Sequence, residues 1–303
     1  MCQLLGMNAA TPTPFDFGFK GFCRRGGGTD IHKDGWGLSL YEGRGLRSFL
    51  DVRACAKSPV ARFIQSYPTS SQNVIAHIRC ATHGRVGLEN VHPFSRELWG
   101  IPWCFAHNGN FPSFAHQNAR YHMRLRESDP LVYHAIGDTD SEAFFCALLN
   151  ALRAEFDTLP TLQDLYKAIL TLMDDLIRND ETMICNFLLG CGPHKLFCYS
   201  CPGHQDGSNV WNGLFYILRE PPMSGTARLT DAEFSIHFDI ATESERIAMI
   251  ATKPLTNESG WIEMKRGELL LFNDGSPYSK LSDIEALEKA GRGLVSRCFL
   301  KAH

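Results

Sequence analysis

The sequence has 303 residues, of which 44% are hydrophobic and 21% charged, with a formal net charge of −3. These values are ordinary for a soluble globular protein and allow a sizeable core in one or two domains. The sequence has no basic stripe, no polybasic segment and no apolar run long enough to cross a bilayer. It therefore predicts neither a nucleic-acid nor a membrane partner.

In the first half of the chain, most of the predicted strands precede the two long predicted helices. In order, it indicates a buried strand at 2–7, a loop rich in Gly, Pro and Phe at 8–33, a hairpin of strands at 37–41 and 46–52, a helix at 59–67 and buried strands at 74–79 and 103–107. Apolar residues at helical spacing then predict two helices, at 140–156 and 161–178.

Short strands punctuated by Gly, Pro and Asn make up the second half. They are predicted at 183–189, 196–200, 214–218, 234–238, 247–252, 261–264 and 268–272, before a last helix at 283–290. This order of elements favours an α+β fold in which helices cover stacked sheets. No glycine-rich linker divides the chain, so we expect one domain.

Eleven cysteines lie along the chain without the regular spacing of a disulfide framework. The N-terminus also lacks a charged segment followed by a long apolar stretch, which is the pattern of a secretory signal. We therefore expect a cytoplasmic protein with free thiols. Cys198 and Cys201 have a zinc-like spacing, with Cys191, His194 and His204 nearby, but a second well-spaced pair is missing and an alternating strand is the simpler interpretation.

Residue 2 is a cysteine, and aminopeptidases remove Met1 when the next residue is small. Cys2 would then carry a thiol and a free α-amine on neighbouring atoms, and the amine, with an ordinary pKa of about 7.7–8.0, can act as the base for the thiol. The simpler alternative is that position 2 holds a small residue of no special function.

A second polar segment runs from His77 to Gly84. Arg79 follows an apolar strand, where its guanidinium can grip a carboxylate through two hydrogen bonds, although a surface ion pair is the commoner role. Thr82 and His83 form a turn able to line the same cleft. His77, inside the strand, is more typical of a core histidine.

Two further segments offer groups for acyl chemistry. Asn108 and Gly109 supply a side-chain amide and an unobstructed backbone N–H, which together can form an oxyanion hole, although Asn-Gly is also a common hairpin turn. Asp140 opens a helix, where it can serve as a capping residue or can hold a substrate ammonium opposite Arg79. Asp34, in a glycine-rich run, is a secondary candidate.

Together these segments resemble the class II glutamine amidotransferases, a family of N-terminal nucleophile hydrolases. The resemblance lies in Cys2, Asp34-Gly-Trp-Gly37, His77-x-Arg-x-Ala-Thr-x-Gly84, Asn90-x-His-Pro93, His107-Asn-Gly109 and Thr139-Asp-Ser-Glu142, and in later similarity at Ser244-Glu-Arg246, Ala251-Thr-Lys-Pro-Leu255, Trp261 and Gly267-Glu-Leu269. Each motif alone is weak, but six in the same order are specific. The stand-alone form is similar to YafJ-type members and to a γ-glutamyl amidohydrolase of ergothioneine biosynthesis.

The resemblance implies a four-layer αββα sandwich over residues 2–272, with 273–303 as an extension packed on the same domain. It also implies hydrolysis of the side-chain amide of glutamine to glutamate and ammonia, without a cofactor or metal. The residues that match the family's positions are Cys2 as nucleophile, Asn108 and Gly109 as oxyanion hole, Arg79 and Asp140 as the groups that bind the α-carboxylate and α-amine, and Thr82 and His83 as lining of the glutamine pocket.

Two departures from the family qualify this expectation. Cys80 stands where many members carry an aromatic residue, and no acceptor domain follows, so a separate synthase subunit is a possible recipient of the ammonia. Residues 111–136 are interpreted as a solvated insertion. Two alternatives stay open: a hydrolase of γ-glutamyl conjugates or peptides that releases a larger amine, and a non-catalytic subunit that senses glutamine.

Overall fold

The computed structural model describes residues 2–81, 84–115, 123–203, 213–219, 227–230, 235–238, 246–257 and 259–293. Its strands are β1 Gln3–Pro14, β2 Trp36–Glu42, β3 Gly45–Asp51, β4 Ser70–Ile78, β5 Phe94–Leu98, β6 Ile101–Asn110, β7 Ile184–Cys191, β8 Lys195–Ser200, β9 Phe215–Arg219, β10 Ala227–Thr230, β11 Ser235–Phe238, β12 Ile247–Ala251, β13 Ile262–Glu263, β14 Glu268–Asn273 and β15 Ser276–Tyr278. The α-helices are α1 Asp16–Arg25, α2 Pro59–Ile64, α3 Asp140–Glu155, α4 Leu162–Asn179 and α5 Leu281–Leu287, with short helical turns η1 Cys55–Lys57, η2 Leu88–Asn90, η3 Pro112–Phe114 and η5 Glu288–Arg292.

Two antiparallel sheets form the centre of the molecule. One has the strand order β13-β9-β12-β1-β4-β2-β3 and the other β15-β14-β8-β7-β6-β5, while β10 and β11 pair with each other. The central strands bury both faces, which explains why their sequences are almost continuously apolar. In β1, for example, Leu4 packs between the sheets and Leu5 packs on the opposite face.

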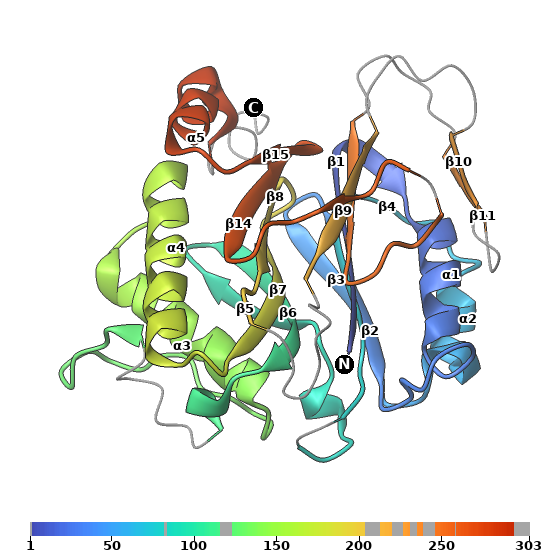
Figure 1. The fold of residues 1–303 in the computed structure, drawn as a ribbon, viewed down its shortest axis with the longest axis horizontal. Helices are drawn as coiled ribbons and strands as arrows, with labels where there is room; N and C mark the ends of the chain where they lie inside the picture. The colour runs from blue at the N-terminus through green and yellow to red at the C-terminus, as the bar shows by residue number, and fades with distance from the viewer. Residues whose placement is uncertain are drawn as a thin grey trace.

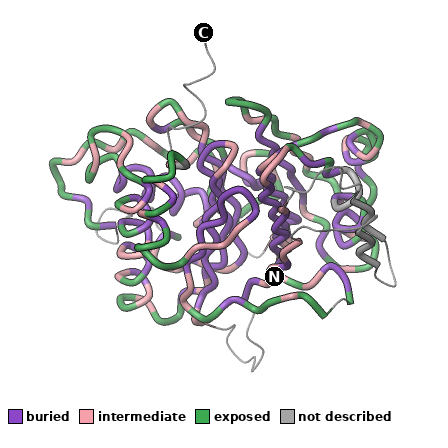
Figure 2. Tube along the Cα trace, turned by 90° about the horizontal axis from the view of Figure 1, so that it is seen from above, coloured by how far each residue is buried: buried purple, intermediate pink, exposed green. Residues whose placement is uncertain are grey.

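Three separate hydrophobic clusters show that the molecule has four layers. One cluster lies between the sheets, one joins α3 and α4 to the sheet of β5–β8, and one joins α1 and α2 to the sheet that contains β1. Figure 1 shows this succession of helices, sheet, sheet and helices. Figure 2 shows buried residues along the central strands and exposed residues on the outer helices. The predicted α+β, four-layer αββα sandwich is confirmed.

Local sequence explains the two central helices. Thr139 caps α3 by accepting a hydrogen bond from the backbone of Glu142, and Thr161 caps α4 in the same way through Asp164. The buried face of α4 follows helical spacing, with Leu165, Ile169, Leu172 and Leu176 all buried. The periodicity therefore predicted both helices to within two residues at each end.

The long loop predicted at 8–33 is wrong. Strand β1 continues to Pro14, and α1 follows at once, packing Phe19 and Phe22 into the outer core. Two glycines in α1, Gly18 and Gly21, lower its helix propensity and obscured the helical spacing of the aromatic residues. Strand β5 was also missed, because it is a short edge strand with alternating exposed residues.

Two of the expected free thiols are paired. Cys23 of α1 and Cys55 of η1 form a disulfide, with their Cα atoms 5.1 Å apart. Thirty-two positions separate them in the sequence, so only the packing of α1 against η1 brings them together. The expectation that all cysteines are free is therefore wrong for this pair.

The solvated insertion predicted at 111–136 is wrong at its start and near its middle, whereas residues 126–136 are exposed or partly exposed, as predicted. Phe111 and Phe114 are fully buried beside α3, and Met123 and Leu125 belong to the same hydrophobic cluster. Residues 116–122, which include His116, Arg120 and His122, lie outside the described residues. Across the described part of the chain, no helix is long and apolar enough to cross a membrane.

Candidate active site

Cys2 lies directly before β1, where the ends of three strands meet. Its sulfur accepts a hydrogen bond from the backbone N–H of Cys80 at 3.3 Å and lies 3.5 Å from the carbonyl oxygen of the same residue. The carbonyl of Cys2 accepts a hydrogen bond from the side-chain amide of Asn108. The N-terminus thus touches both the segment after β4 and the end of β6.

Arg79 is buried, one residue beyond the end of β4. Its guanidinium donates to the backbone carbonyls of Arg85, at 2.9 Å, and Gly84, at 3.5 Å. The surface ion pair that we considered for Arg79 is therefore wrong. The loop after Arg79 thus holds the buried guanidinium in place. The next residue, Cys80, contacts Cys2.

Asp34 fixes the backbone of the segment that touches Cys2. Its carboxylate accepts a hydrogen bond from the N–H of Ala81 at 2.9 Å, and its own N–H donates to the carbonyl of Arg79 at 3.2 Å. The neighbouring carbonyl of Gly35 accepts from the N–H of Arg79 at 2.8 Å. Sequence reasoning ranked Asp34 low because these partners lie more than forty positions away.

Asn108 and Gly109 lie within β6, paired with Asn186 and Cys185 of β7, so the hairpin-turn alternative is wrong. Gly109 has φ of +148°, and a Cβ atom there would lie 1.8 Å from the carbonyl oxygen of Ile184. Only glycine fits this position. The amide nitrogen of Asn108 carries two hydrogens, so its bond to Cys2 leaves one further donor.

Asp140 is the first residue of α3, and Thr139, not Asp140, is the capping residue. The Asp140 carboxylate accepts hydrogen bonds from the backbone N–H groups of Phe111, at 2.6 Å, and Ser141, at 2.8 Å. Phe111 directly follows β6. This carboxylate therefore joins the start of α3 to the strand that carries Asn108 and Gly109.

Gly84 marks the place where Arg79 approaches the start of α3. A Cβ atom at Gly84 would lie 3.5 Å from a guanidinium nitrogen of Arg79, 2.7 Å from a carboxylate oxygen of Asp138 and 3.3 Å from the side chain of Thr139. The cation and the helix end that bears Asp140 thus meet across one glycine. Thr82 and His83, the other predicted site residues, lie outside the described residues.

Three buried histidines lie beside these groups. His77 and His92 contact each other through ring nitrogens at 3.1 Å, which confirms His77 as a core residue. His107 contacts the carbonyl of Ile184 at 3.2 Å and the hydroxyl of Ser141 at 2.9 Å. A carbonyl only accepts, so Nε2 of His107 carries the proton and Nδ1 accepts from Ser141.

Burial sets the protonation of these groups. Desolvation lowers the pKa of His107 to about 4 and holds the pKa values of His77 and His92 well below the ordinary range. All three rings are neutral near pH 7. Desolvation also raises the pKa of the Cys2 thiol to about 11, so this thiol needs a base before it can attack.

The family model for class II glutamine amidotransferases matches residues 1–291. This chain belongs to that family. Two curated relatives are the "Putative glutamine amidotransferase YafJ" of Escherichia coli, 38% identical over 90% of this chain and 97% of the relative, and the "Putative glutamine amidotransferase" of Haemophilus influenzae, 36% identical over 93% and 87%.

One solved structure agrees with this family assignment, and a second shares the fold. A predicted glutamine amidotransferase from Pseudomonas aeruginosa is 35% identical, with a TM-score of 0.66 over 92% of this chain and all of the other. A glutamine phosphoribosylpyrophosphate amidotransferase from B. subtilis matches with a TM-score of 0.53 over 92% of this chain and 49% of the other, at 16% identity. The second likeness shows the shared fold alone.

The zinc alternative at Cys198 and Cys201 does not fit the structure. Cys198 packs between the two sheets, whereas Cys201 packs on the helix side of its sheet, so the two thiols lie in different layers. Among the described residues, no three His, Cys, Asp or Glu side chains gather to hold a metal ion. His204 lies outside the described residues.

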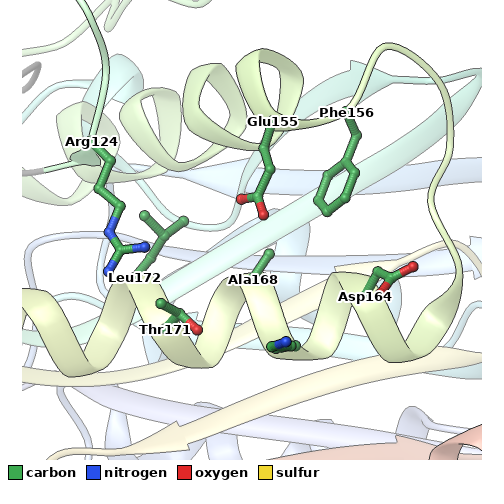
Figure 3. Close-up of a pocket in the computed structure, with 8 residues that line it drawn as sticks. Arg124, Glu155, Phe156, Asp164, Ala168, Thr171 and Leu172 are labelled. Atoms are coloured by element: carbon green, nitrogen blue, oxygen red, sulfur yellow. The ribbon is translucent and has the colours of Figure 1, made fainter.

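A cavity elsewhere on the molecule is separate from the candidate site. It has a volume of about 260 Å³ and lies between the end of α3 and the start of α4, where Arg124, Glu155, Asp164 and Lys167 bring charges of both signs to its wall. Figure 3 shows Asp164 on α4, Glu155 at the end of α3, and Arg124 beside them. None of the predicted site residues lines it.

The neutral histidines predict acid destabilisation of the fold. The pKa of His107, about 4 in the folded state, lies below the ordinary value of 6.5, so the unfolded chain binds more protons as the pH falls. Stability is therefore full above pH 6.5 and is lost progressively towards pH 4. We expect the melting temperature to fall by at least about 5 °C between about pH 7.5 and 4.5.

Calorimetry across this pH range checks the prediction. The variant H92Q keeps a hydrogen-bonding group beside His77 but removes one titrating ring, and its melting temperature is expected to depend less on pH. H134Q, at an exposed histidine, serves as the control and should follow the wild type. A pH profile that is the same for H92Q and H134Q would contradict this account.

Proposed function

We propose that this family member hydrolyses the side-chain amide of glutamine with Cys2 as the nucleophile after removal of Met1. The proposal is supported chiefly by one observation: Cys2 contacts Asn108 directly and also contacts the residue that follows Arg79. Three groups from distant parts of the sequence thus meet at the chain's beginning. Glutamate and ammonia are the products.

In the proposed reaction, the α-amine of Cys2 removes the thiol proton, and the thiolate attacks the side-chain carbonyl carbon of glutamine. The second amide N–H of Asn108 and the backbone N–H of Gly109 donate to the oxyanion that forms. Ammonia leaves with the proton that the amine has held. Water then cleaves the γ-glutamyl thioester and restores the thiol.

The neighbouring charges account for recognition of an amino acid. Arg79 binds the α-carboxylate of the substrate, and Asp140 binds its α-ammonium group, so the two ends of the zwitterion have separate anchors. Thr82 and His83 complete the pocket in this proposal. The buried guanidinium loses little conformational entropy on binding, because backbone carbonyls already hold it.

The α-amine is the base that best fits the surroundings of Cys2. His107 is neutral, but its Nδ1 accepts from Ser141 and its Nε2 donates to a backbone carbonyl, so neither nitrogen is available for the thiol. His77 and His92 are fully buried or nearly so, with their rings in contact. An N-terminal amine with a pKa near neutrality needs no such side chain.

Ammonia release from glutamine by purified, Met1-free protein tests the proposal. A panel of glutamine, glutathione and other γ-glutamyl amides separates a glutaminase from a hydrolase that releases a larger amine. Calorimetric binding of glutamine without turnover would instead favour a sensing subunit. Activity that appears only with a second protein would indicate a separate ammonia-acceptor subunit.

Asp34 is expected to support this reaction through the backbone. In D34A, Ala81 loses its carboxylate partner, so Cys80 and Arg79 are positioned less well, and we expect kcat/KM for glutamine to fall by about tenfold or more. D34N keeps an oxygen that can accept from Ala81 and is expected to retain most of the activity. Steady-state kinetics of the two variants, with circular dichroism as the folding control, decide the matter. Equal losses in both would show that the carboxylate acts otherwise.

A further inference from the structure

Two thiols stand apart from the other free cysteines in the described part of the chain. Cys2 and Cys80 are partly accessible to solvent, whereas the other six free cysteines there are buried. Cys23 and Cys55 are already joined. Any small oxidant that reaches a thiol in this part of the molecule therefore meets Cys2 or Cys80 first.

The backbone geometry brings these two residues within reach of each other. The sulfur of Cys2 lies 3.3 Å from the amide nitrogen of Cys80, which puts it at most about 4.8 Å from the Cα of Cys80 once the N–Cα bond is added. In a disulfide the two Cα atoms lie about 4.4–6.8 Å apart. Continuing the register in which Gln3 pairs with Ile78 sets Cys2 opposite Arg79 and beside Cys80, so rotation of the side chains and a small shift close the gap.

The contacts of the two residues are compatible with this bond. The backbone around Cys80 is fixed, because Asp34 holds Ala81 and Gly35 holds Arg79. Cys2 precedes the first residue of β1, so no strand pairing restrains its side chain. Asn108 holds the carbonyl of Cys2, so rotation of the two side chains is the main motion that the bond needs.

We propose that Cys2 and Cys80 form a reversible disulfide that switches the enzyme off under oxidation by a hydroperoxide. The proposal rests on the proposed function, since Cys2 is the nucleophile that the bond would block. It gives a role to Cys80, the residue at which this chain departs from the aromatic residue of many family members.

The reaction balances in two steps. The α-amine of Cys2 takes the thiol proton, and the sulfur attacks the hydroperoxide, which accepts that proton and is reduced to an alcohol or water while the sulfur becomes a sulfenic acid. The sulfur of Cys80 then attacks the Cys2 sulfur, the S–O bond breaks, and the oxygen leaves as water with the proton of the Cys80 thiol. A dithiol reductant returns both sulfurs to thiols.

The bond would have two consequences for the site. It blocks the nucleophile, because a Cys2 sulfur bonded in a disulfide cannot form the thiolate that attacks the substrate. It also protects the nucleophile, because a sulfenic acid without a resolving thiol is oxidised further to a sulfinic acid that dithiols do not reduce. Reversibility, not resistance to oxidation, is therefore the property that Cys80 supplies.

Peptide mapping after treatment of the full chain with hydrogen peroxide tests the bond itself. We expect a linked peptide that carries Cys2 and Cys80 and an intact mass about 2 Da lower, both reversed by dithiothreitol. A treated wild-type protein in which no Cys2–Cys80 peptide forms would overturn the proposal. A linked peptide that joins Cys185 and Cys201, which lie buried side by side, in place of it would do the same.

Recovery of activity tests the consequence. Each protein is compared with its own untreated sample, so effects of the substitution on basal activity cancel. After peroxide and then dithiothreitol, the wild type and C198A, a matched variant at a buried cysteine, should recover at least about half of their activity. C80A should recover less than a tenth and gain about 32 Da on Cys2.

Equal recovery in C80A and C198A would overturn the proposed switch. If the untreated wild type shows no glutaminase activity, the proposed function fails instead, and the mass of the linked peptide still decides whether the disulfide forms. The two proposals can thus fail independently.

Discussion

Replacing Cys2 with alanine is expected to lower kcat/KM for glutamine by at least about a thousandfold, because the γ-glutamyl thioester can no longer form. The effect on stability should be small. The side chain of Cys2 lies outside the strand pairing, and its backbone contact with Asn108 is retained in the variant. Ammonia release measured beside thermal unfolding separates loss of chemistry from loss of fold.

A second form of the protein tests the amine independently of the thiol. A chain that retains a residue before Cys2 keeps the thiol but blocks the α-amine, and it should lose most of its activity because the thiol has a pKa of about 11 and lacks a base. Intact mass shows which form is present. Full turnover by C2A, or by the extended form, would refute the assigned role of the N-terminus.

Gly109→Ala is expected to be the most damaging substitution away from Cys2. The added methyl group would lie 1.8 Å from the carbonyl oxygen of Ile184, and φ of +148° already disfavours any side chain. Strand β6 must therefore shift against β7, which displaces Asn108 and the N–H of residue 109. We expect a loss of about a hundredfold or more in kcat, as for removal of one oxyanion donor, together with a lower melting temperature.

Gly100→Ala is the matched control for this prediction. Gly100 also has positive φ, +74°, but no atom lies within 4 Å of the position that its Cβ would occupy. This variant is expected to lose only about 1 kcal/mol of stability from backbone strain and to keep its activity. If G109A and G100A lose activity equally, strain and not the geometry of the oxyanion site explains the result.

Local sequence patterns were sufficient to predict those elements that are stabilised mainly by residues close in sequence. The caps Thr139 and Thr161 and the apolar spacing that follows them fixed α3 and α4. The same reasoning failed at α1, whose glycines weaken the local helix signal and whose stability comes from packing Phe19 and Phe22 on the sheet. Cap and periodicity are local properties, whereas packing is not.

Some residues of the candidate site could be predicted from the sequence, and others could not. The residue types at positions 2, 79, 108, 109 and 140 could be selected by chemistry and by resemblance to a family. The importance of Asp34 could not, because its carboxylate acts on the backbone of Ala81, which carries no signature in sequence. Sequence patterns also could not predict that Cys23 pairs with Cys55 or that Cys80 contacts Cys2, because both contacts join residues that are distant in sequence.

The sequence by itself determined the family, because motif order is written along the chain, and through that resemblance it predicted the αββα layers and the candidate reactive groups. The tertiary structure alone decided which groups meet. Where β1 begins and β4 and β6 end, Cys2 reaches Cys80 and Asn108, and Gly84 lies between Arg79 and the start of α3. Contacts between residues eighty or a hundred positions apart depend on sheet register and layer packing. No local pattern encodes either of these.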